Sequence, residues 1–563
     1  MAEIILEPRD MTRLMAPTAS ERPVREAENR LERFNADREL LLAEVERRVV
    51  ERLVAEAGAG GDASLEYVLN DVAFCEIRRL EGGKKNGAVE RWRELSRRLL
   101  GMNEQEKREE LRELVAYYGR DIVGNFDPRV YKFATGIGPS LLGFLFSPTA
   151  SLRAGLSTLR NLDARIHADG DLEVVRACAE RGTIVVTPTH SSNMDSPAIG
   201  LALLRAGLPP TTYGAGKNLF SNPFISFFMR NLGAYRVDRR LRFDLYKNVL
   251  KEYSTVLLEH GYHSLFFPGG TRCRSNIIER HLKLGLLGTT VTAYKNCVRQ
   301  GAPHKRIYIV PATINYRLVL EAETLIEDYL AETGKRRHII TDDEFNRLGR
   351  LLEFFRKILV HEGSVVVRFG RPFDPFGNEV TDDGESLDRA GRAVDPATFV
   401  RGADGEVADD DQRDAEYTRA LGQRLADAYP RLTVLHGTSL VARALYDAIA
   451  RHAGTRDVYR LIRAPQGHLE VPAAAAIEEL VRLRARIAAS SAYGAEHPLY
   501  AGLPAAELLD DAVKGLATYH TRPIVERAGG GGLLQVKDVK LLYYYQNRTA
   551  HIPPEKVSAE GAP

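Results

Sequence analysis

The spacing of hydrophobic positions divides the chain into three parts. From about residue 20 to residue 133, long charged segments carry apolar residues at intervals of three and four, the period of an amphipathic helix. From about residue 161 to residue 375, short β-branched runs such as GTIVVTP, RIYIVPATI and SVVVRFG alternate with helical stretches. After residue 418 the helical period returns. The alternation in the middle predicts an α/β domain with a largely buried β-sheet flanked by helices.

We therefore expect four regions. Residues 1–160 form an N-terminal helical region, residues 161–375 the α/β domain and residues 418–563 a C-terminal helical region. The remaining segment, residues 376–417, contains 13 acidic residues against 4 arginines and is rich in glycine. Many charges and few apolar residues are typical of solvent-exposed chain, so this segment is expected to be an acidic surface insertion or a linker.

Composition narrows the classes of function. The 563 residues carry a formal net charge of +2, which provides no general attraction to nucleic acid or to anionic lipid. The four cysteines show no paired short spacing, so neither a metal site nor a redox pair is expected, and the chain fits a reducing compartment. The N-terminus lacks the apolar run and small-residue cleavage site of a secretory signal. We expect a cytoplasmic protein without a metal or a nucleic-acid partner.

The sequence has no stretch of about 20 predominantly apolar residues, the length that a membrane-spanning helix needs. The nearest candidate is the uncharged segment from Phe133 to Leu152, which contains Pro139 and Pro148. Its apolar centre, LLGFLF, is too short to span a bilayer. The segment is either buried or dips into a membrane interface, and the sequence leaves both interpretations open.

A candidate catalytic pair lies at the end of a predicted strand. His190 follows GTIVVTPT, and Asp195 stands five positions later at the start of a predicted helix. A carboxylate near a histidine can fix the tautomer and orientation of a general base. The same spacing occurs at His338 with Asp343 and at His452 with Asp457, so spacing alone decides nothing. His190 is preferred because it follows a predicted buried strand, where ligand sites of α/β proteins tend to lie.

Three further blocks follow His190 in order: GAYRVDRR at residues 233–240, LFFPGGTRCRS at residues 265–275 and VPATINY at residues 310–316. A strand that runs into Pro-Gly-Gly-Thr-Arg-Cys-Arg offers backbone N–H groups, a hydroxyl and two guanidinium groups, which together suit a phosphate. A turn with two solvated arginines is the alternative for this block taken by itself.

The four blocks HSSNMD, GAYRVDRR, FFPGGTRCRS and VPATINY resemble those of the glycerolipid acyltransferase family, in the family's order and across about 125 residues. The resemblance implies that residues 161–375 are an acyltransferase catalytic domain. Further similarity, in LEYVLNDVAFCEIRRL, GRDIVGNFDPRVYKFA, LKLGLLGT and the terminal KLLYYYQNR, is to the larger glycerol-3-phosphate and dihydroxyacetone-phosphate acyltransferases.

The resemblance implies a role for each site residue. His190 deprotonates the acceptor hydroxyl for attack on an acyl thioester, and Asp195 orients His190. Pro311 shapes the acyl-donor side, and Lys217 matches a basic position between the first two blocks. The residues implied in holding the phosphate of the acceptor are Arg239, Gly270, Thr271, Arg272 and Arg274. No cofactor is implied; acyl-coenzyme A (acyl-CoA) or acyl carrier protein (acyl-ACP) is the co-substrate.

One position departs from the family pattern. The third block usually reads Phe, any residue, Glu, Gly, whereas Gly269 stands in this chain where the glutamate is expected. Two adjacent glycines let backbone N–H groups approach an oxyanion or a phosphate closely.

The resemblance implies acyl transfer in phospholipid biosynthesis, to the sn-1 hydroxyl of glycerol 3-phosphate, by a protein attached peripherally to the cytoplasmic face of the membrane. Acylation of 1-acylglycerol 3-phosphate or of dihydroxyacetone phosphate is open as an alternative within the same class. Two alternatives of other classes are a catalytically inactive membrane-associated scaffold, suggested by Gly269, and a thioesterase that uses His190 and water.

Overall fold

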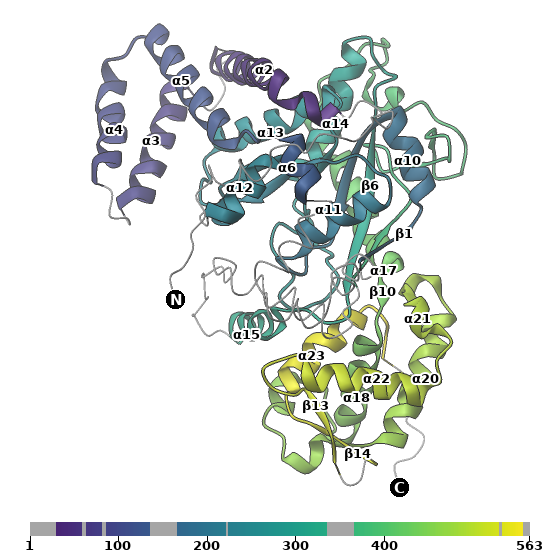
Figure 1. Cartoon of the computed structure of the whole chain (residues 1–563). Coiled ribbons are helices and arrows are strands. Elements are labelled where there is room, and N and C mark those ends of the chain that lie inside the picture. Colours follow the sequence, from purple (N-terminus) through teal and green to yellow (C-terminus); the bar gives the residue numbers. More distant parts are fainter. Residues whose placement is uncertain are drawn as a thin grey trace, which may run out of the picture.

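The computed structural model describes residues 30–58, 64–81, 86–134, 166–220, 223–334, 365–528 and 532–554. Figure 1 shows them as a central sheet with helices packed around it, a group of N-terminal helices to one side, and a C-terminal region beyond one end of the sheet. The central part confirms the predicted α/β fold with N-terminal and C-terminal helical regions.

The central sheet has seven strands in the order β1-β7-β6-β2-β5-β3-β4. Strands β6, β2, β5, β3 and β4 run parallel, β7 is antiparallel to β6, and β1 is parallel to β7. The strands are Ile166–Gly170 (β1), Gly182–Pro188 (β2), Thr212–Gly216 (β3), Ala234–Val237 (β4), Ser264–Leu265 (β5), Arg306–Tyr316 (β6) and Val365–Phe369 (β7).

The side chains of strand β2 are buried on both faces of the sheet. Alternate side chains point to opposite faces of a sheet. Ile184 and Val186 join the hydrophobic cluster that contains helices α10 and α11, whereas Val185 joins the cluster that contains α14. Both faces are therefore covered, as a continuous apolar run predicts. The flanking helices are α10 (Leu172–Arg181), α11 (Asp195–Arg205), α13 (Asp244–Glu259) and α14 (Leu284–Arg299), with α12 (Pro223–Asn231), α15 (Ala322–Thr333) and the short helix η4 (Lys217–Phe220) near the sheet edge.

The N-terminal helices pack on the sheet domain through α13. Arg48 of the first described helix forms ion pairs with Glu252 and with Glu259 of α13, the second at 2.7 Å. Helix α5 begins with a capping box in which Asn103 and Glu106 each accept a backbone N–H from the other residue. The elements are α2 (Arg30–Gly58), α3 (Leu65–Glu81), α4 (Asn86–Arg98), η1 (Leu99–Gly101), α5 (Glu104–Ile122) and α6 (Pro128–Lys132).

The acidic segment, residues 376–417, is folded onto the sheet domain rather than extended as a linker. Phe376, Ala397 and Val400 are buried in the same hydrophobic cluster as α14. Acidic side chains form its turns: Asp388 accepts the N–H groups of Ala390 and Arg392, at 2.8 and 2.9 Å. Of the two predicted alternatives, the segment corresponds to a surface insertion, in which carboxylates bond to their own backbone while a few apolar residues anchor the segment. It contains β8 (Glu379–Val380), β9 (Ser386–Leu387), η6 (Pro396–Val400) and the start of α17 (Asp411–Leu432).

The C-terminal region is built around helix α18, which packs against α20, α22 and α23. It also contains a three-stranded antiparallel sheet, which the helical pattern did not predict. Its helices are α18 (Gly437–His452), α19 (Val458–Leu461), α20 (Ala473–Ala488), α21 (Pro498–Ala501), α22 (Ala505–Thr518) and α23 (Val539–Gln546), with η7 (Gln466–Leu469), η8 (Ser491–Tyr493) and η10 (Asn547–Thr549). Its strands are β10 (Val434–Leu435), β11 (Glu470–Pro472), β12 (Ala495–Glu496), β13 (Val525–Ala528) and β14 (Leu533–Val536).

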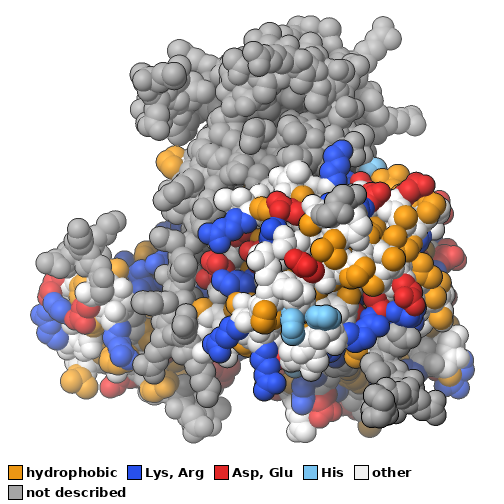
Figure 2. Space-filling model, turned by 90° about the horizontal axis from the view of Figure 1, so that it is seen from below, with side chains coloured by type: hydrophobic (Ala, Val, Ile, Leu, Met, Phe, Trp, Pro, Cys, Tyr) orange, Lys and Arg blue, Asp and Glu red, His pale blue; other side chains and the backbone are white. Residues whose placement is uncertain are grey.

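None of the described helices is long and apolar enough to cross a membrane. The predicted interfacial segment lies almost entirely outside the described residues, including its apolar centre at residues 141–146. Figure 2, which views the molecule from below, shows hydrophobic side chains gathered on part of the exposed face among charged ones. Large exposed hydrophobic side chains of the C-terminal region include Tyr459, Ile462, Val481 and Leu499.

The end of the chain docks beside the sheet through α23 and η10. The buried guanidinium of Arg548 donates to Ile314 O at 3.1 Å and to Asn315 Oδ1 at 2.9 Å, both at the end of β6. Asn547 donates to Ser275 O at 2.9 Å in the loop that follows β5. The terminal KLLYYYQNR sequence thus connects the C-terminal region to two segments of the α/β domain.

Replacing Arg548 tests this connection. Arg548→Ala leaves the buried Asn315 oxygen without this donor, which costs about 1–3 kcal/mol, so the midpoint of thermal unfolding is expected to fall by about 1–3 degrees. Lys540→Ala, a change on α23 at a side chain that pairs with Glu327 near the surface, is the control and should change stability by less than about 0.5 kcal/mol. Equal melting temperatures for the two variants would contradict the role of Arg548.

Candidate active site

The predicted site residues lie along one edge of the sheet. Strands β2, β5, β3 and β4 are parallel, so their carboxyl ends meet at that edge, where ligands bind in α/β proteins. His190 follows β2, the Gly270–Arg274 segment follows β5, Lys217 follows β3 and Arg239 follows β4. Because neighbouring strands lie about 4.8 Å apart, β3 and β4 are about 10 and 15 Å from β2 across the sheet.

Asp195 is a fully buried carboxylate that receives four hydrogen bonds. Its Oδ2 lies 2.7 Å from His190 Nδ1 and accepts the N–H groups of Ser191 and Ser192 at 2.6 and 2.9 Å. Its Oδ1 accepts the hydroxyl of Tyr316 at 2.7 Å. Asp195 is also the first residue of α11, where the positive end of the helix dipole favours a negative charge.

This arrangement assigns the two ring nitrogens of His190 to different tasks. A hydrogen bond to the Asp195 carboxylate requires a proton on Nδ1, which leaves Nε2 of the neutral ring as a proton acceptor. Burial, together with the negative charge of Asp195, raises the pKa of Tyr316 well above its usual value, so the phenol stays protonated and keeps donating. This orientation is the one that the predicted role of His190 as a general base requires.

The segment after β5 holds His190 from the other side. The ring of Phe267 stacks on the imidazole, with 4.3 Å between ring centroids. The N–H of Cys273 donates to His190 O at 2.7 Å, and the N–H of His190 donates to Glu279 Oε1 at 3.2 Å. Both backbone polar groups of the candidate base are therefore bonded to one loop.

The turn between β2 and α11 is fixed by Glu321, at the start of α15. Its buried carboxylate accepts the hydroxyl of Ser192 at 2.8 Å and the N–H of Asn193 at 3.0 Å. Arg272 Nη1 lies 3.8 Å from Glu321 Oε1. Of the predicted phosphate-binding residues, Arg272 is therefore placed beside the turn that carries His190.

The other residues of the third block surround a tight turn. Gly270 has a φ of +74°, a conformation that favours glycine, and Thr271 is exposed. Arg274 pairs with Glu332 at 2.7 Å, in a contact that is open to solvent.

Pro311 is buried inside β6, in register with Thr187 of β2, three residues before His190.

Lys217 and Arg239 lie farther along the edge. Lys217 Nζ is 3.1 Å from Asp238 Oδ2 and 3.6 Å from Asp121 of α5, whereas the side chain of Arg239 is exposed. Although burial acts to raise it, hydrogen bonds from Arg240 and Lys217 lower the pKa of Asp238 to about 2. Lys217 is thus held by carboxylates of the second block and of the N-terminal helices.

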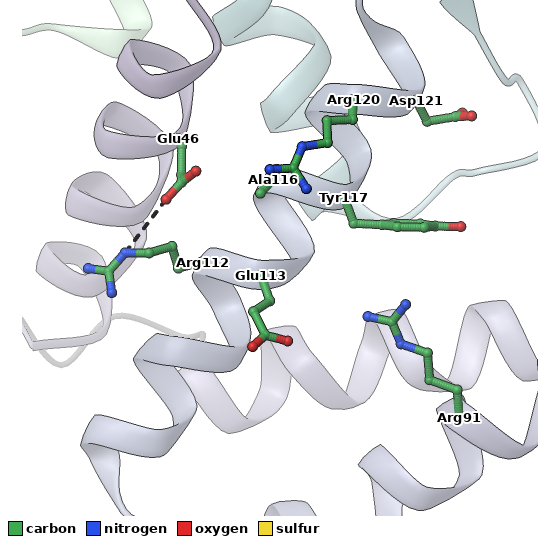
Figure 3. A pocket seen from close by; sticks show the side chains of 8 residues that line it. All are labelled: Glu46, Arg91, Arg112, Glu113, Ala116, Tyr117, Arg120 and Asp121. Atoms are coloured by element: carbon green, nitrogen blue, oxygen red, sulfur yellow. Dashed lines mark ion pairs between the residues drawn. The ribbon is translucent and has the colours of Figure 1, made fainter. Parts of the chain in front are cut away.

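A pocket of about 690 Å³ lies between α2, α4 and α5, and Asp121 is one of the residues that line it (Figure 3). Two of its three arginines have partners: Arg112 pairs with Glu46 at 3.7 Å, and the guanidinium of Arg91 lies over the ring of Tyr117 at 5.3 Å. Three arginines face three acidic residues in its lining, so the pocket carries no excess of charge for a phosphate.

The structure also separates His190 from the other histidines with the same spacing. His452 is exposed, and Asp457 caps α19 by accepting the N–H of Arg460 rather than contacting the histidine. His338 and Asp343 lie outside the described residues. Within the part of the chain that the structure describes, no group of His, Cys, Asp and Glu side chains is arranged to hold a metal ion.

Sequence reasoning missed several groups around His190. Tyr316 ends the quoted VPATINY block, so its place in the pattern was visible although no role was assigned to it. Glu279 and Glu321 stand outside the four blocks, and only the folded chain brings them to the turn at residues 190–193.

Comparisons with known proteins point to the same family as the sequence blocks. Residues 168–315, which contain the first three blocks and the fourth as far as Asn315, match the family model for acyltransferases. This part of the chain is similar to acyltransferase domains. The resemblance noted in the sequence is thereby confirmed.

Relatives of this part of the chain include proteins named glycerol-3-phosphate acyltransferase. That of Pseudomonas paraeruginosa is 31% identical over 202 residues, which are 36% of this chain and 22% of the relative. Those of Ectopseudomonas mendocina and Xanthomonas campestris pv. campestris are 31% and 30% identical over 203 residues, which are 36% of this chain and 23% and 21% of the relatives. The chain spans about a fifth of the length of the curated relatives it matches.

The Asp195 network gives a prediction about stability. Tyr316→Phe removes one donor from a buried carboxylate, at a cost of about 1.5–3 kcal/mol, and should lower the midpoint of thermal unfolding by about 1–3 degrees. Tyr213→Phe is a matched control, because the Tyr213 hydroxyl contacts the weak acceptor Met229 Sδ. If both variants melt at the same temperature, the Tyr316 hydroxyl does not stabilise Asp195.

Proposed function

We propose that this protein transfers a fatty acyl group from acyl-CoA or acyl-ACP to the sn-1 hydroxyl of glycerol 3-phosphate, with His190 as general base. The observation that carries the proposal is the hydrogen bond between His190 Nδ1 and the buried Asp195, in a domain that matches the acyltransferase family. The names of the relatives favour glycerol 3-phosphate over the other acceptors.

The reaction needs one proton acceptor. His190 Nε2 takes the proton of the acceptor hydroxyl as its oxygen attacks the carbonyl carbon of the thioester. The tetrahedral intermediate collapses with cleavage of the carbon–sulfur bond, and the leaving thiolate takes the proton back from the imidazolium. Asp195 stabilises that imidazolium through Nδ1, as a buried carboxylate does in a catalytic triad.

We assign the phosphate of the acceptor to the basic residues at the same edge of the sheet as His190. Arg272 lies beside the turn at His190, and the backbone around Gly270 and the hydroxyl of Thr271 belong to the same loop. Guanidinium groups bind phosphate oxygens with charge-assisted bonds, two at a time where the geometry allows. Arg274, Lys217 and Arg239 are assigned to the outer part of this cationic edge.

Peripheral attachment to the cytoplasmic face of the membrane is part of the proposal, because the acylated product is insoluble in water. Exposed apolar side chains of the C-terminal region support it (Figure 2).

A thioesterase is disfavoured by the cationic loop at the site, and an inactive scaffold by the intact His190–Asp195 pair.

The first test is release of thiol from palmitoyl-CoA, and from an acyl-ACP donor, with detergent and with each candidate acceptor. Release should require glycerol 3-phosphate, and His190→Ala should lower it by about 10²- to 10⁴-fold. His452→Ala is the matched control, because this exposed histidine has the same spacing to an aspartate and should leave the rate unchanged.

Other results of the thiol-release assay would favour a different acceptor or a different class of function. Release that requires dihydroxyacetone phosphate or 1-acylglycerol 3-phosphate would change the acceptor and keep the chemistry. Release without any acceptor would favour a thioesterase, and no release with either donor would favour the scaffold.

Arg272→Gln tests the phosphate site. Loss of a charge-assisted contact is worth about 1.5–3 kcal/mol, so KM for glycerol 3-phosphate should rise about ten- to a hundredfold, while KM for the acyl donor changes little. Arg280→Gln, at an exposed position of the same loop, is the control. An unchanged KM for glycerol 3-phosphate would remove Arg272 from the phosphate site.

A further inference from the structure

The space beside Gly269 is filled by a carboxyl group from elsewhere in the loop. A Cβ atom placed on Gly269 would lie 2.4 Å from Glu279 Oε1 and 2.8 Å from its Cδ. The carboxyl of Glu279 therefore stands where the side chain of residue 269 would project. The third block has glycine at this position, where a glutamate is expected from the family resemblance.

The path of the loop explains how Glu279 reaches this place. Gly270 turns the chain, and its N–H donates to Phe267 O at 3.0 Å. The loop then folds back, so that the N–H of Lys283 donates to Pro268 O at 2.6 Å. The residues around 279 are thereby brought next to those around 269, although ten positions separate the two along the chain.

The Glu279 carboxyl contacts the backbone of the candidate base. The N–H of His190 donates to its Oε1 at 3.2 Å, while the carbonyl of His190 accepts from Cys273 of the same loop. Its Oε2 is buried and has no hydrogen-bond partner among the residues that the structure describes. Glu279 thus fixes the main chain that carries the imidazole.

Its surroundings favour the neutral form of this carboxyl. Burial raises the pKa of Glu279 to about 8; the His190 N–H and the positive charge of Arg548 oppose the rise, and the negative charge of Asp195 adds to it. Cys273 and Tyr429 are the other titratable groups close to it. Near pH 7 the group is mostly protonated, which suits a hydrogen-bonding role rather than that of a second base.

We propose that Glu279 is a positioning residue for His190 and supplies, from ten residues farther along the chain, the carboxyl group that position 269 lacks. The proposal rests on the proposed function, in which His190 is the base. It requires that only one of the two positions carries a side chain: glycine at 269 leaves room for Glu279, and a side chain at 269 displaces it.

The decisive experiment moves the carboxyl group. Glu279→Ala should lower kcat for glycerol-3-phosphate-dependent thiol release by about ten- to a hundredfold with little change in KM, since the His190 N–H loses its acceptor. Glu279→Gln keeps an oxygen acceptor and should retain most of the rate. The double variant Gly269→Glu/Glu279→Ala should recover at least about tenfold over Glu279→Ala.

The matched control is Gly269→Met/Glu279→Ala, which fills the same space without an acceptor and should stay as slow as Glu279→Ala. A normal kcat for Glu279→Ala would overturn the proposal. Equal rates for the two double variants would overturn it as well, because filling the space would then be sufficient.

Thermal unfolding of the same variants does not depend on activity. Gly269→Ala alone should lower the melting temperature, because its Cβ meets the Glu279 carboxyl, and adding Glu279→Ala should return part of the loss. Additive effects of the two changes would show that the side chains do not share one space, which contradicts the proposal. If the wild type releases no thiol, the proposed function fails, and this coupling still decides whether Glu279 occupies the place of residue 269.

A pH series separates the titration of Glu279 from its packing. The native carboxyl keeps its proton up to about pH 8, whereas the unfolded chain loses it near the usual value of 4.5, so native stability contributed by this group falls as pH rises between these values. Glu279→Gln cannot titrate and should show a smaller fall in melting temperature from pH 5 to pH 8 than the wild type. An unchanged fall would contradict the buried, proton-holding carboxyl.

Discussion

The buried carboxylate of Asp195 is the constraint on which the rest of the site depends. A carboxylate removed from water is stable only if donors replace the lost solvent, and here four do so, from the His190 ring, two backbone amides and Tyr316. The donors come from the end of β2, the start of α11 and the far end of β6. Their positions are therefore coupled: a shift of any one of these elements would leave the charge incompletely solvated.

The length of β6 joins this network to the C-terminal region. Ala312 of β6 pairs with Pro188 at the end of β2, so the last residues of β6 project past the sheet edge and bring Tyr316 to Asp195. The projecting part has no β2 backbone to pair with. It is held by β7 on one side and by Arg548, whose buried guanidinium bonds to the backbone and side chain at residues 314 and 315. The C-terminal helices thus support the strand that brings Tyr316 to Asp195.

Local patterns in the sequence predicted the sheet and the contact between His190 and Asp195, because both depend on neighbouring residues. The run GTIVVTP has apolar side chains on both faces, and its position before His190 distinguished that histidine from His452, whose partner Asp457 caps a helix. The acidic segment and Arg548 were harder to interpret. Their roles depend on contacts with residues far away in sequence, such as the 233 positions between Arg548 and Asn315, and no periodicity records such contacts.

Gly269 and Glu279 show why a motif can look incomplete while the site is not. A motif states which side chain stands at a position in the chain, whereas the proposed role of His190 needs a hydrogen-bond acceptor for its N–H at a point in space. A loop that folds back on itself can place an acceptor at that point from position 269 or from position 279. Because Gly269 has no Cβ, the side chain of Glu279 has room to reach it. The glycine at position 269 is therefore part of the same arrangement as the glutamate at position 279, and it gives no reason to expect an inactive site.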